Sequence, residues 1–299
     1  MSGEEWALAA IPAAVAGAGL WWSLRYGAPP ADFVPIIMFH KVDPQWEWGG
    51  TRQGPKSFAR KMRFLHKSGF GTISLTHYLD QLTAGSKPPA GTFVLTFDDA
   101  YAGLLEHALP VLGELDYTAT IFAPSAKLGR ENDWELRFGS HFRHMTGEEL
   151  RQAVHAGHEI GSHGRRHIPL VGLDDTRLHD ELAGSKQELE DLLGQEVKTI
   201  SYPYGRVDAR VKLATQHAGY IGACSSYPGT RTSIVDRYEL RRLGVYSIDT
   251  MRMVAVKLRG RPLWWWATLD LAMRLINRFS IFSQLWRITR RDSPSRTND

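Results

Sequence analysis

Residues 91–99 read GTFVLTFDD, an apolar run that ends in two adjacent carboxylates, Asp98 and Asp99. A run of this kind predicts a buried strand, and α/β folds place their ligands at the carboxyl ends of such strands. Because successive strand residues point to opposite faces, we expect the two carboxylates to aim in different directions. One of them can bind a metal ion while the other reaches a water or a substrate beside it.

A pair of histidines follows in HGRRH, at His163 and His167, directly after the strand-like run HEIGS. Their four-residue spacing predicts two imidazoles on one face of a helical turn. One carboxylate and two histidines leave coordination positions open, which is typical of a catalytic rather than a structural metal. Each motif alone is more often a cap or a solvated helix face. A third polar strand end, at 197–205 (VKTISYPYG), favours a single site built from all three.

These motifs resemble those of the polysaccharide deacetylase family, also called the NodB-homology family or carbohydrate esterase family 4. The chain has TFDDAY where the family has TFDDGY, EIGSHGRRH where it has EIGSHTxxH, and SYPYG where it has RxPYG. The flanking stretches PIIMFHKV and YELRRLGV resemble the branch that acts on poly-N-acetylglucosamine-type substrates. The resemblance extends over residues 35–245.

The length and the alternation of patterns predict one α/β barrel with appendages. Helices are predicted at 57–68, from a capping box at Thr146 and Glu149 to Gly157, and at 174–193 before Gly194. The resemblance implies a distorted (β/α) barrel of about seven to eight parallel strands. We therefore expect a hydrophobic helical anchor at 1–30, the barrel at 31–250 and a basic, aromatic amphipathic tail at 251–299. Strands are predicted at 35–39, 72–75, 92–97, 119–123, 159–161, 199–202, 220–223 and 240–246.

The resemblance also implies the roles of individual residues. Asp99, His163 and His167 would hold one divalent metal ion, with Zn²⁺ expected. Asp98 would be the general base, and the backbone N–H of Tyr204 would complete an oxyanion hole. The implied activity is metal-dependent hydrolysis that removes N-acetyl groups from an aminosugar glycan or glycolipid.

Three departures from the family pattern affect these roles. The arginine of RxPYG is missing, with Tyr202 taken as its replacement, so Arg242 in LRRLG is the candidate to orient Asp98. The late LxxHD element that carries the family's general acid has no match after Val245, and His40 is the candidate replacement at the end of the first strand. Gly164 replaces the Ser or Thr that follows the first metal histidine, which removes a hydroxyl that helps to fix the site.

The two ends of the chain suggest a membrane surface. Residues 6–22 carry no charge and are preceded by Glu4 and Glu5, so an uncleaved anchor is expected rather than a secretory signal. Arg25 on the carboxyl side favours the cytoplasmic face, with the outer face of the cell envelope as the alternative. From position 252 onward, ten basic side chains oppose three acidic ones, a net charge of +7 against +4 for the whole chain.

In that tail, three adjacent tryptophans at 264–266 precede apolar residues at helical spacing. This composition is typical of an interfacial helix on an anionic membrane and suits nucleic acid poorly. A helix that packs on the underside of the barrel remains the alternative for its first half. The expected substrate is an N-acetylated aminosugar glycan or a lipid-linked sugar, and no nucleic acid is expected.

The sequence leaves three functions open. The first is deacetylation of an aminosugar glycan. The second is deacetylation or deformylation of an aminosugar on a polyprenyl carrier, which the two ends of the chain would explain. The third is a catalytically inactive carbohydrate-binding barrel, because the general acid and the motif arginine are displaced. The single cysteine, Cys224, excludes an intramolecular disulfide and gives weak evidence for a reducing compartment.

Overall fold

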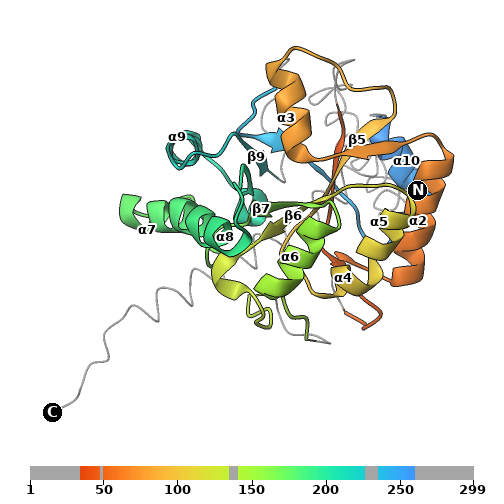
Figure 1. The fold of residues 1–299 in the computed structure, drawn as a ribbon, viewed down its shortest axis with the longest axis horizontal. Coiled ribbons are helices and arrows are strands. Elements are labelled where there is room, and N and C mark those ends of the chain that lie inside the picture. Colours follow the sequence, from red (N-terminus) through yellow and green to blue (C-terminus); the bar gives the residue numbers. More distant parts are fainter. Residues whose placement is uncertain (1–33, 48–49, 135–140, 226–234, 260–299) are drawn as a thin grey trace, which may run out of the picture. The chain divides into compact units, whose positions relative to one another are not determined.

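The computed structural model describes residues 34–47, 50–134, 141–225 and 235–259. Within Pro29–Asn132 and Arg137–Arg261, the described residues form one compact unit, in which helices surround a parallel sheet (Figure 1). Every expected site residue lies in this unit. The expected anchor at 1–30 and the tail from residue 260 onward lie outside the described residues.

The sheet has the order β10-β9-β8-β7-β6-β5-β1-β11, and all of its pairings are parallel. A further strand, β4, pairs with the first half of β5. The register is fixed by pairs such as Ile37 with Leu95, between β1 and β5. The strands are β1 (Ile36–Phe39), β4 (Gly71–Ile73), β5 (Thr92–Phe97), β6 (Thr120–Ala123), β7 (Glu159–Ser162), β8 (Thr199–Ser201), β9 (Gly222–Ser225), β10 (Leu240–Arg241) and β11 (Leu243–Gly244).

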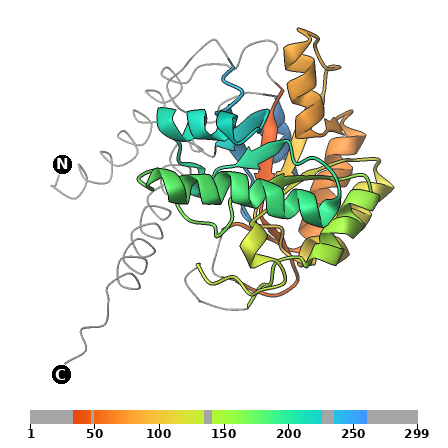
Figure 2. The same cartoon turned by 60° about the vertical axis from the view of Figure 1, so that its left-hand side comes forward.

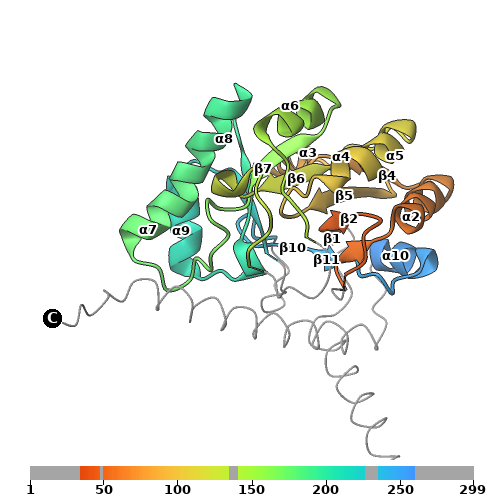
Figure 3. The ribbon, with the colours of Figure 1, turned by 90° about the horizontal axis from the view of Figure 1, so that it is seen from below.

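The ring of strands closes through a single stretch of chain. The sequence predicted one strand at 240–246, but the structure divides it into β10 and β11. Leu240 pairs with Cys224 on β9, whereas Leu243 pairs with Ile37 on β1. Figure 3 shows β11 beside β1. The break falls at Arg242, which belongs to neither strand. The nearly closed parallel barrel is therefore confirmed, and its seam lies at Arg242.

Helices connect most of the strands. They are α2 (Pro55–Lys67), α3 (Leu75–Thr83), α4 (Gly103–His107), α5 (Leu109–Glu114), α6 (Gly147–His155), α7 (Asp175–His179), α8 (Ser185–Leu193), α9 (Ala209–His217) and α10 (Met251–Leu258). Two short 3₁₀ turns are η1 (Ser125–Lys127) and η3 (Pro203–Gly205). Outside the barrel, β2 (Lys41–Val42) and β3 (Arg52–Gln53) form a small parallel pair.

The helix ends follow the expected local chemistry. The capping box of α6 is present, because Thr146 and Glu149 each accept a hydrogen bond from the other's backbone. The predicted helix at 174–193 begins at the N-cap Asp174 and ends at Gly194, whose φ is 67°. It is not a regular α-helix, however, because the π-helical turn η2 (Asp180–Gly184) lies between α7 and α8. Figure 2 shows the three pieces as one long helix.

The core lies between the strands and the helices. Phe58, Met62 and Leu65 form the buried stripe of α2, and the ring of Phe58 packs edge-on against Phe39 of β1. Helix α10 packs on α2 and buries Val254 and Leu258 in the same core. The structure thus places 251–258, the start of the expected tail, with the barrel.

No described helix is both long enough and apolar enough to cross a bilayer.

Candidate active site

Asp99, His163 and His167 lie together at the carboxyl ends of β5 and β7. Asp99 Oδ1 is 3.5 Å from His163 Nε2 and 3.4 Å from His167 Nε2. Zn²⁺–ligand bonds of about 2.0–2.1 Å at a tetrahedral angle separate two donor atoms by about 3.4 Å. All three side chains are buried. The donor set and its spacing therefore fit one small divalent ion with positions left open for other ligands.

The two histidines do not share a helical turn, so that expectation is wrong. Residues 163–167 form a tight loop without helical structure, in which Gly164 has φ 72° and His167 has φ 57°. The loop folds the two rings together, with their centroids 4.8 Å apart. The four-residue spacing therefore predicted the correct pair of histidines, although a loop and not a helical turn brings their rings together.

The two carboxylates do not diverge as strand alternation predicted. Strand β5 ends at Phe97, and Asp99 has a left-handed φ of 69°, so its side chain turns back towards the site. As a result His163 Nε2 lies 3.9 Å from Asp98 Oδ2 and 3.5 Å from Asp99 Oδ1. Both carboxylates therefore face one reaction centre.

Backbone strain concentrates in this region. Among the described residues, five non-glycine residues have positive φ, and four of them belong to the motifs of the site: Asp99, Ala100, His167 and Tyr204. Such conformations cost about 1–3 kcal/mol each and persist where the surrounding structure enforces them. The fold therefore holds these side chains in unfavourable local geometry to bring them together.

The histidines are held in the neutral state that ligation requires. Burial lowers the pKa of His163 and, more strongly, that of His167. His163 Nδ1 donates a hydrogen bond of 2.7 Å to the carbonyl of Ser201, which leaves Nε2 facing the site. A backbone acceptor of this kind fixes both the tautomer and the orientation of a ligating imidazole.

Asp98 forms a bidentate ion pair with Arg242. The two guanidinium–carboxylate distances are 2.6 Å and 2.7 Å, and the Arg242 side chain is fully buried. Arg242 Nη2 also donates to Ser201 Oγ at 2.7 Å, and the Ser201 hydroxyl donates to Asp98 at 3.3 Å. The seam of the barrel thus places the guanidinium of Arg242 on the carboxylate of Asp98, while its role in orienting a general base stays a prediction.

Ser201, not Tyr202, occupies the position of the missing motif arginine, two residues before Pro203. The Tyr202 side chain points elsewhere, and its hydroxyl donates to the carbonyl of Tyr238. The small Ser201 side chain, at the end of β8, leaves room for the guanidinium of Arg242, which comes from the seam after β10, two strands along the sheet. The chain therefore keeps the arginine–aspartate pair while it changes the strand that supplies the arginine.

The environment of Asp98 keeps this carboxyl ionised. Burial opposes the charge, but the positive charge of Arg242 and its hydrogen bonds outweigh it and hold the pKa of Asp98 well below its usual range. An ionised carboxylate beside the metal triad can accept a proton at neutral pH.

We expect removal of the Arg242 charge to change the pH dependence of the enzyme. In Arg242→Gln the burial of Asp98 is no longer offset, so the pKa of Asp98 rises and the acid limb of the kcat/KM profile moves to higher pH. Arg242→Lys keeps a charge and should move the limb less. The profiles are recorded at saturating metal, and an acid limb that stays in place in Arg242→Gln would contradict this account.

His40 and Tyr204 lie beside the triad. His40 follows β1 and is close enough to Asp98 and Arg242 for their charges to act on its ring. Burial of the ring lowers the pKa of His40 to about 4. Tyr204 lies in η3 with φ 60°, and its ring packs on His167 with centroids 4.8 Å apart. The structure thus brings all seven expected site residues to one region.

One buried histidine was missed as a supporting residue. The sequence analysis gave His144 no role, but its Nδ1 lies 2.7 Å from the carbonyl oxygen of Asp99, the residue whose backbone is strained. The ring also stacks on Tyr101, with centroids 4.9 Å apart. No sequence motif marks His144 as a site residue. Its position becomes apparent only in the fold, where His144 pairs with Tyr101 at the end of the TFDDAY motif through an isolated β-bridge.

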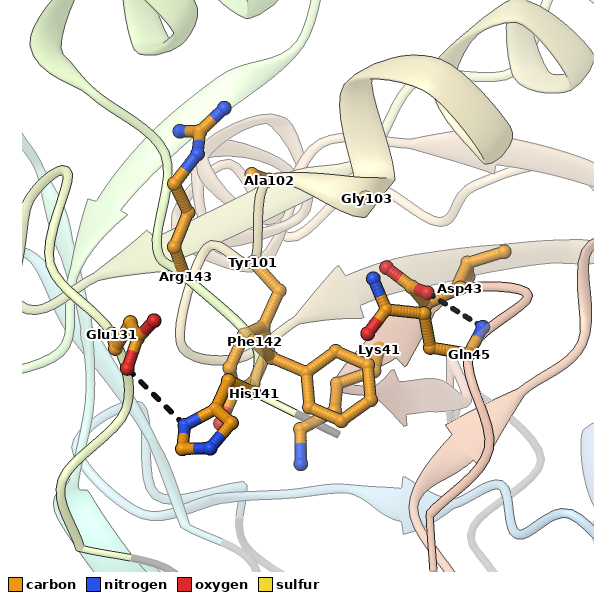
Figure 4. A pocket seen from close by; sticks show the side chains of 11 residues that line it. Lys41, Asp43, Gln45, Tyr101, Ala102, Gly103, Glu131, His141, Phe142 and Arg143 are labelled. Atoms are coloured by element: carbon orange, nitrogen blue, oxygen red, sulfur yellow. Dashed lines mark hydrogen bonds and ion pairs between the residues drawn. The ribbon is translucent and has the colours of Figure 1, made fainter. Parts of the chain in front are cut away.

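A pocket of about 280 Å³ opens next to this stack (Figure 4). Tyr101 and Phe142 form aromatic surface in its wall, and Asp43, Gln45 and Glu131 bring polar side chains to it. These residues come from the segments that follow β1, β5 and β6 on the side of the metal triad. Tyr101, two residues after Asp99, connects the pocket to the TFDDAY motif.

Comparison with known proteins agrees with this geometry. The profile described as polysaccharide deacetylase matches residues 85–223. YxkH of Bacillus subtilis, a curated relative assigned to the polysaccharide deacetylases, is 29% identical over 212 residues, which are 71% of each chain.

Solved structures give the same fold. The deacetylase PplD of Streptococcus pyogenes, in complex with acetate, has a TM-score of 0.66 at 18% identity and covers 75% of this chain and 97% of its own. IcaB from Ammonifex degensii has a TM-score of 0.65 at 20% identity and covers 78% of this chain and 100% of its own. At such identities these two matches establish the fold alone.

Proposed function

We propose that the chain is a member of the polysaccharide deacetylase family and that it removes N-acetyl groups from an aminosugar glycan in a metal-dependent hydrolysis. The observation that carries the proposal is the buried Asp98–Arg242 pair, which lies 3.9 Å from a ligand of the triad. An inactive carbohydrate-binding barrel would gain nothing from burying such a pair, which is costly to desolvate.

The residues divide the reaction between them. Asp99, His163 and His167 would hold the ion, for which the nitrogen-rich donor set favours Zn²⁺. A divalent ion bound there supplies Lewis-acid polarisation of the acetyl carbonyl and lowers the pKa of a water. Asp98 takes the proton of the attacking water on its carboxylate, and Arg242 keeps that carboxylate ionised and oriented. The backbone N–H of Tyr204 donates to the oxygen that becomes negative.

His40 would deliver a proton to the departing nitrogen. With a pKa of about 4 its ring is neutral at pH 7, so it must first gain a proton during the reaction, the one that Asp98 takes from the attacking water, and can then donate it to the nitrogen. Negative charge that develops on the acetyl oxygen raises the proton affinity of a nearby imidazole. This timing suits a group that has to act as an acid only after water has attacked.

The pocket lined by Tyr101 and Phe142 supports a substrate longer than one sugar. Its carboxylate, amide and guanidinium groups, from Asp43, Gln45 and Arg143, suit the hydroxyls of a neighbouring sugar ring. We therefore favour a glycan over a single lipid-linked aminosugar as the substrate.

Turnover on substrates of increasing length tests this function. The Zn²⁺-loaded protein is incubated with N-acetylglucosamine, with its oligomers and with membrane glycolipids, and acetate release and loss of acetyl mass are followed. We expect oligomers to be deacetylated with a higher kcat/KM than the monosaccharide. Turnover of glycolipids alone would favour the polyprenyl-linked alternative, and binding without acetate release would favour the carbohydrate-binding one.

We also propose that the protein works at a membrane surface, with the cytoplasmic face favoured. This part rests on the composition of 6–22 and on the tryptophans and the charge of the segment from 260 onward, where seven arginines oppose three aspartates, a net charge of +4. A reporter fused after residue 299 distinguishes the cytoplasmic face from the outer face of the envelope.

We expect truncation after residue 260 to weaken binding to anionic vesicles and to leave deacetylation of a small oligomer unchanged. The cut spares α10, which packs in the core, and every proposed site residue. Binding of the full chain should fall as salt is added, because surface charges are screened. Neutral vesicles serve as the control, and equal vesicle binding by both chains would contradict the proposal.

A further inference from the structure

A buried glutamate contacts the loop that carries the two metal histidines. Glu181 is fully buried, and its Oε2 accepts hydrogen bonds from the backbone N–H groups of Arg165 and Arg166 at 2.9 Å and 3.0 Å. Its Oε1 forms an ion pair of 2.8 Å with Arg166 Nε. Both arginines lie between His163 and His167. One carboxylate therefore binds the turn between the two ligands through three contacts.

The position of Glu181 coincides with the irregular turn of the long helix. It lies in η2, the π-helical turn that interrupts the helix between α7 and α8. A π turn holds an extra residue, which changes the direction in which neighbouring side chains point, and such turns occur often at functional sites. Here the turn places a carboxylate among buried apolar neighbours such as Leu178 and Leu182. A carboxylate in such a place must be hydrogen-bonded, and the loop supplies the donors.

The loop is shaped to receive this carboxylate. A Cβ on Gly164 would lie 3.2 Å from Glu181 Oε2 and 3.3 Å from Pro203 Cγ, and its φ of 72° favours glycine. The family's Ser or Thr therefore does not fit at this position. Two other hydroxyls hold the glycine instead, because Ser162 accepts from its N–H at 3.1 Å and Ser185 donates to its carbonyl at 2.9 Å.

We propose that Glu181 is a positioning residue for the metal site, which holds the turn at Arg165 and Arg166 between the two metal histidines. The loop between the histidines has a strained backbone at His167. Its three contacts with the buried carboxylate of Glu181 restrain the loop. Preorganised ligands bind a metal more tightly, and loss of a supporting group of this kind typically costs 10–100-fold in metal affinity. The inference rests on the metal-dependent function proposed above.

Metal affinity of the intact chain tests it. Glu181→Gln keeps the size of the side chain, but it replaces one acceptor oxygen by an N–H₂ group that faces N–H donors. We expect its dissociation constant for Zn²⁺, measured by competition with a chromogenic chelator, to rise about 10–100-fold. The matched control is Glu188→Gln, an exposed glutamate that bonds the Arg165 side chain and not the loop backbone. Its affinity should stay within about twofold of the parent.

The thermal transition of each variant is recorded in excess chelator, so that a general loss of stability is seen separately from a loss of affinity. If Glu181→Gln does not fold, Arg166→Ala removes the contact to Oε1 from the half-exposed side of the loop and should weaken Zn²⁺ binding several-fold. An unchanged dissociation constant in the folded variant tested overturns the inference. A parent protein that binds Zn²⁺ tightly but deacetylates nothing overturns the proposed function and leaves this inference standing.

Discussion

Asp98→Asn is expected to lower kcat by about two to four orders of magnitude while the protein keeps its metal. The amide has the shape of the carboxylate and can still accept a hydrogen bond from Arg242, but it cannot take a proton from water. Because the lost interaction is needed only as the proton moves, KM should change little. The measurement is steady-state kinetics on an N-acetylglucosamine oligomer, with elemental analysis of the same sample.

The variant also needs a test of folding. Asp98 and Arg242 are both buried, and removal of one charge from a buried pair can destabilise a protein by about 3–5 kcal/mol. A thermal unfolding curve shows whether Asp98→Asn is folded at the assay temperature. This distinguishes loss of the base from loss of the fold. Asp175→Asn, a change at an exposed carboxylate, serves as the control. Activity within about threefold of the parent in a folded, metal-loaded Asp98→Asn would remove this residue from the role of base.

Much of the barrel could be predicted from the sequence because local patterns and the final packing agree. The apolar run at 92–97 forms the strand β5, the stripe of Phe58, Met62 and Leu65 faces the core, and the capping box at Thr146 forms. In each case one short segment contains the whole signal. The candidate site residues were predictable for a related reason, since each follows a strand whose carboxyl end lies on one face of the barrel.

The geometry that brings those residues together was not predictable by periodicity. Strand alternation separated Asp98 from Asp99, and helical spacing paired His163 with His167, yet both arguments fail in the structure. The backbone departs from regular structure at Asp99 and at His167, where positive φ values redirect the side chains. Local rules assume low-energy backbone conformations, and a functional site can be stabilised in others by the rest of the fold.

Contacts between residues far apart in the chain also could not be predicted from local sequence patterns. Arg242 replaces an arginine that the family carries on another strand, and only the seam between β10 and β11 shows why its guanidinium reaches Asp98. Glu181 lies in an unremarkable stretch of helical sequence, and its contact with the histidine loop depends on a π turn. In both cases the partners are separated in the chain and their pairing depends on three-dimensional register.

His163→Ala and His167→Ala are each expected to remove the metal and, with it, all activity that depends on the metal. A triad offers only three protein donors, so a loss of one leaves a carboxylate and a single imidazole, which bind a divalent ion weakly. The fall in affinity should exceed the 10–100-fold that is typical for loss of a supporting residue, because a direct bond is lost.

Elemental analysis after dialysis measures this loss, and His155→Ala at the exposed end of α6 should retain the ion. Burial lowers the pKa of both ligating histidines, so in the folded protein each imidazole is neutral and ready to bind at neutral pH. Removing the ion from the parent with a chelator should therefore abolish activity reversibly, and Zn²⁺ should restore it without refolding. If both histidine variants kept a full complement of metal, the ion would bind elsewhere, and the assignment of Asp99, His163 and His167 as its ligands would be wrong. The buried pair of Asp98 and Arg242 would then have to serve a different reaction.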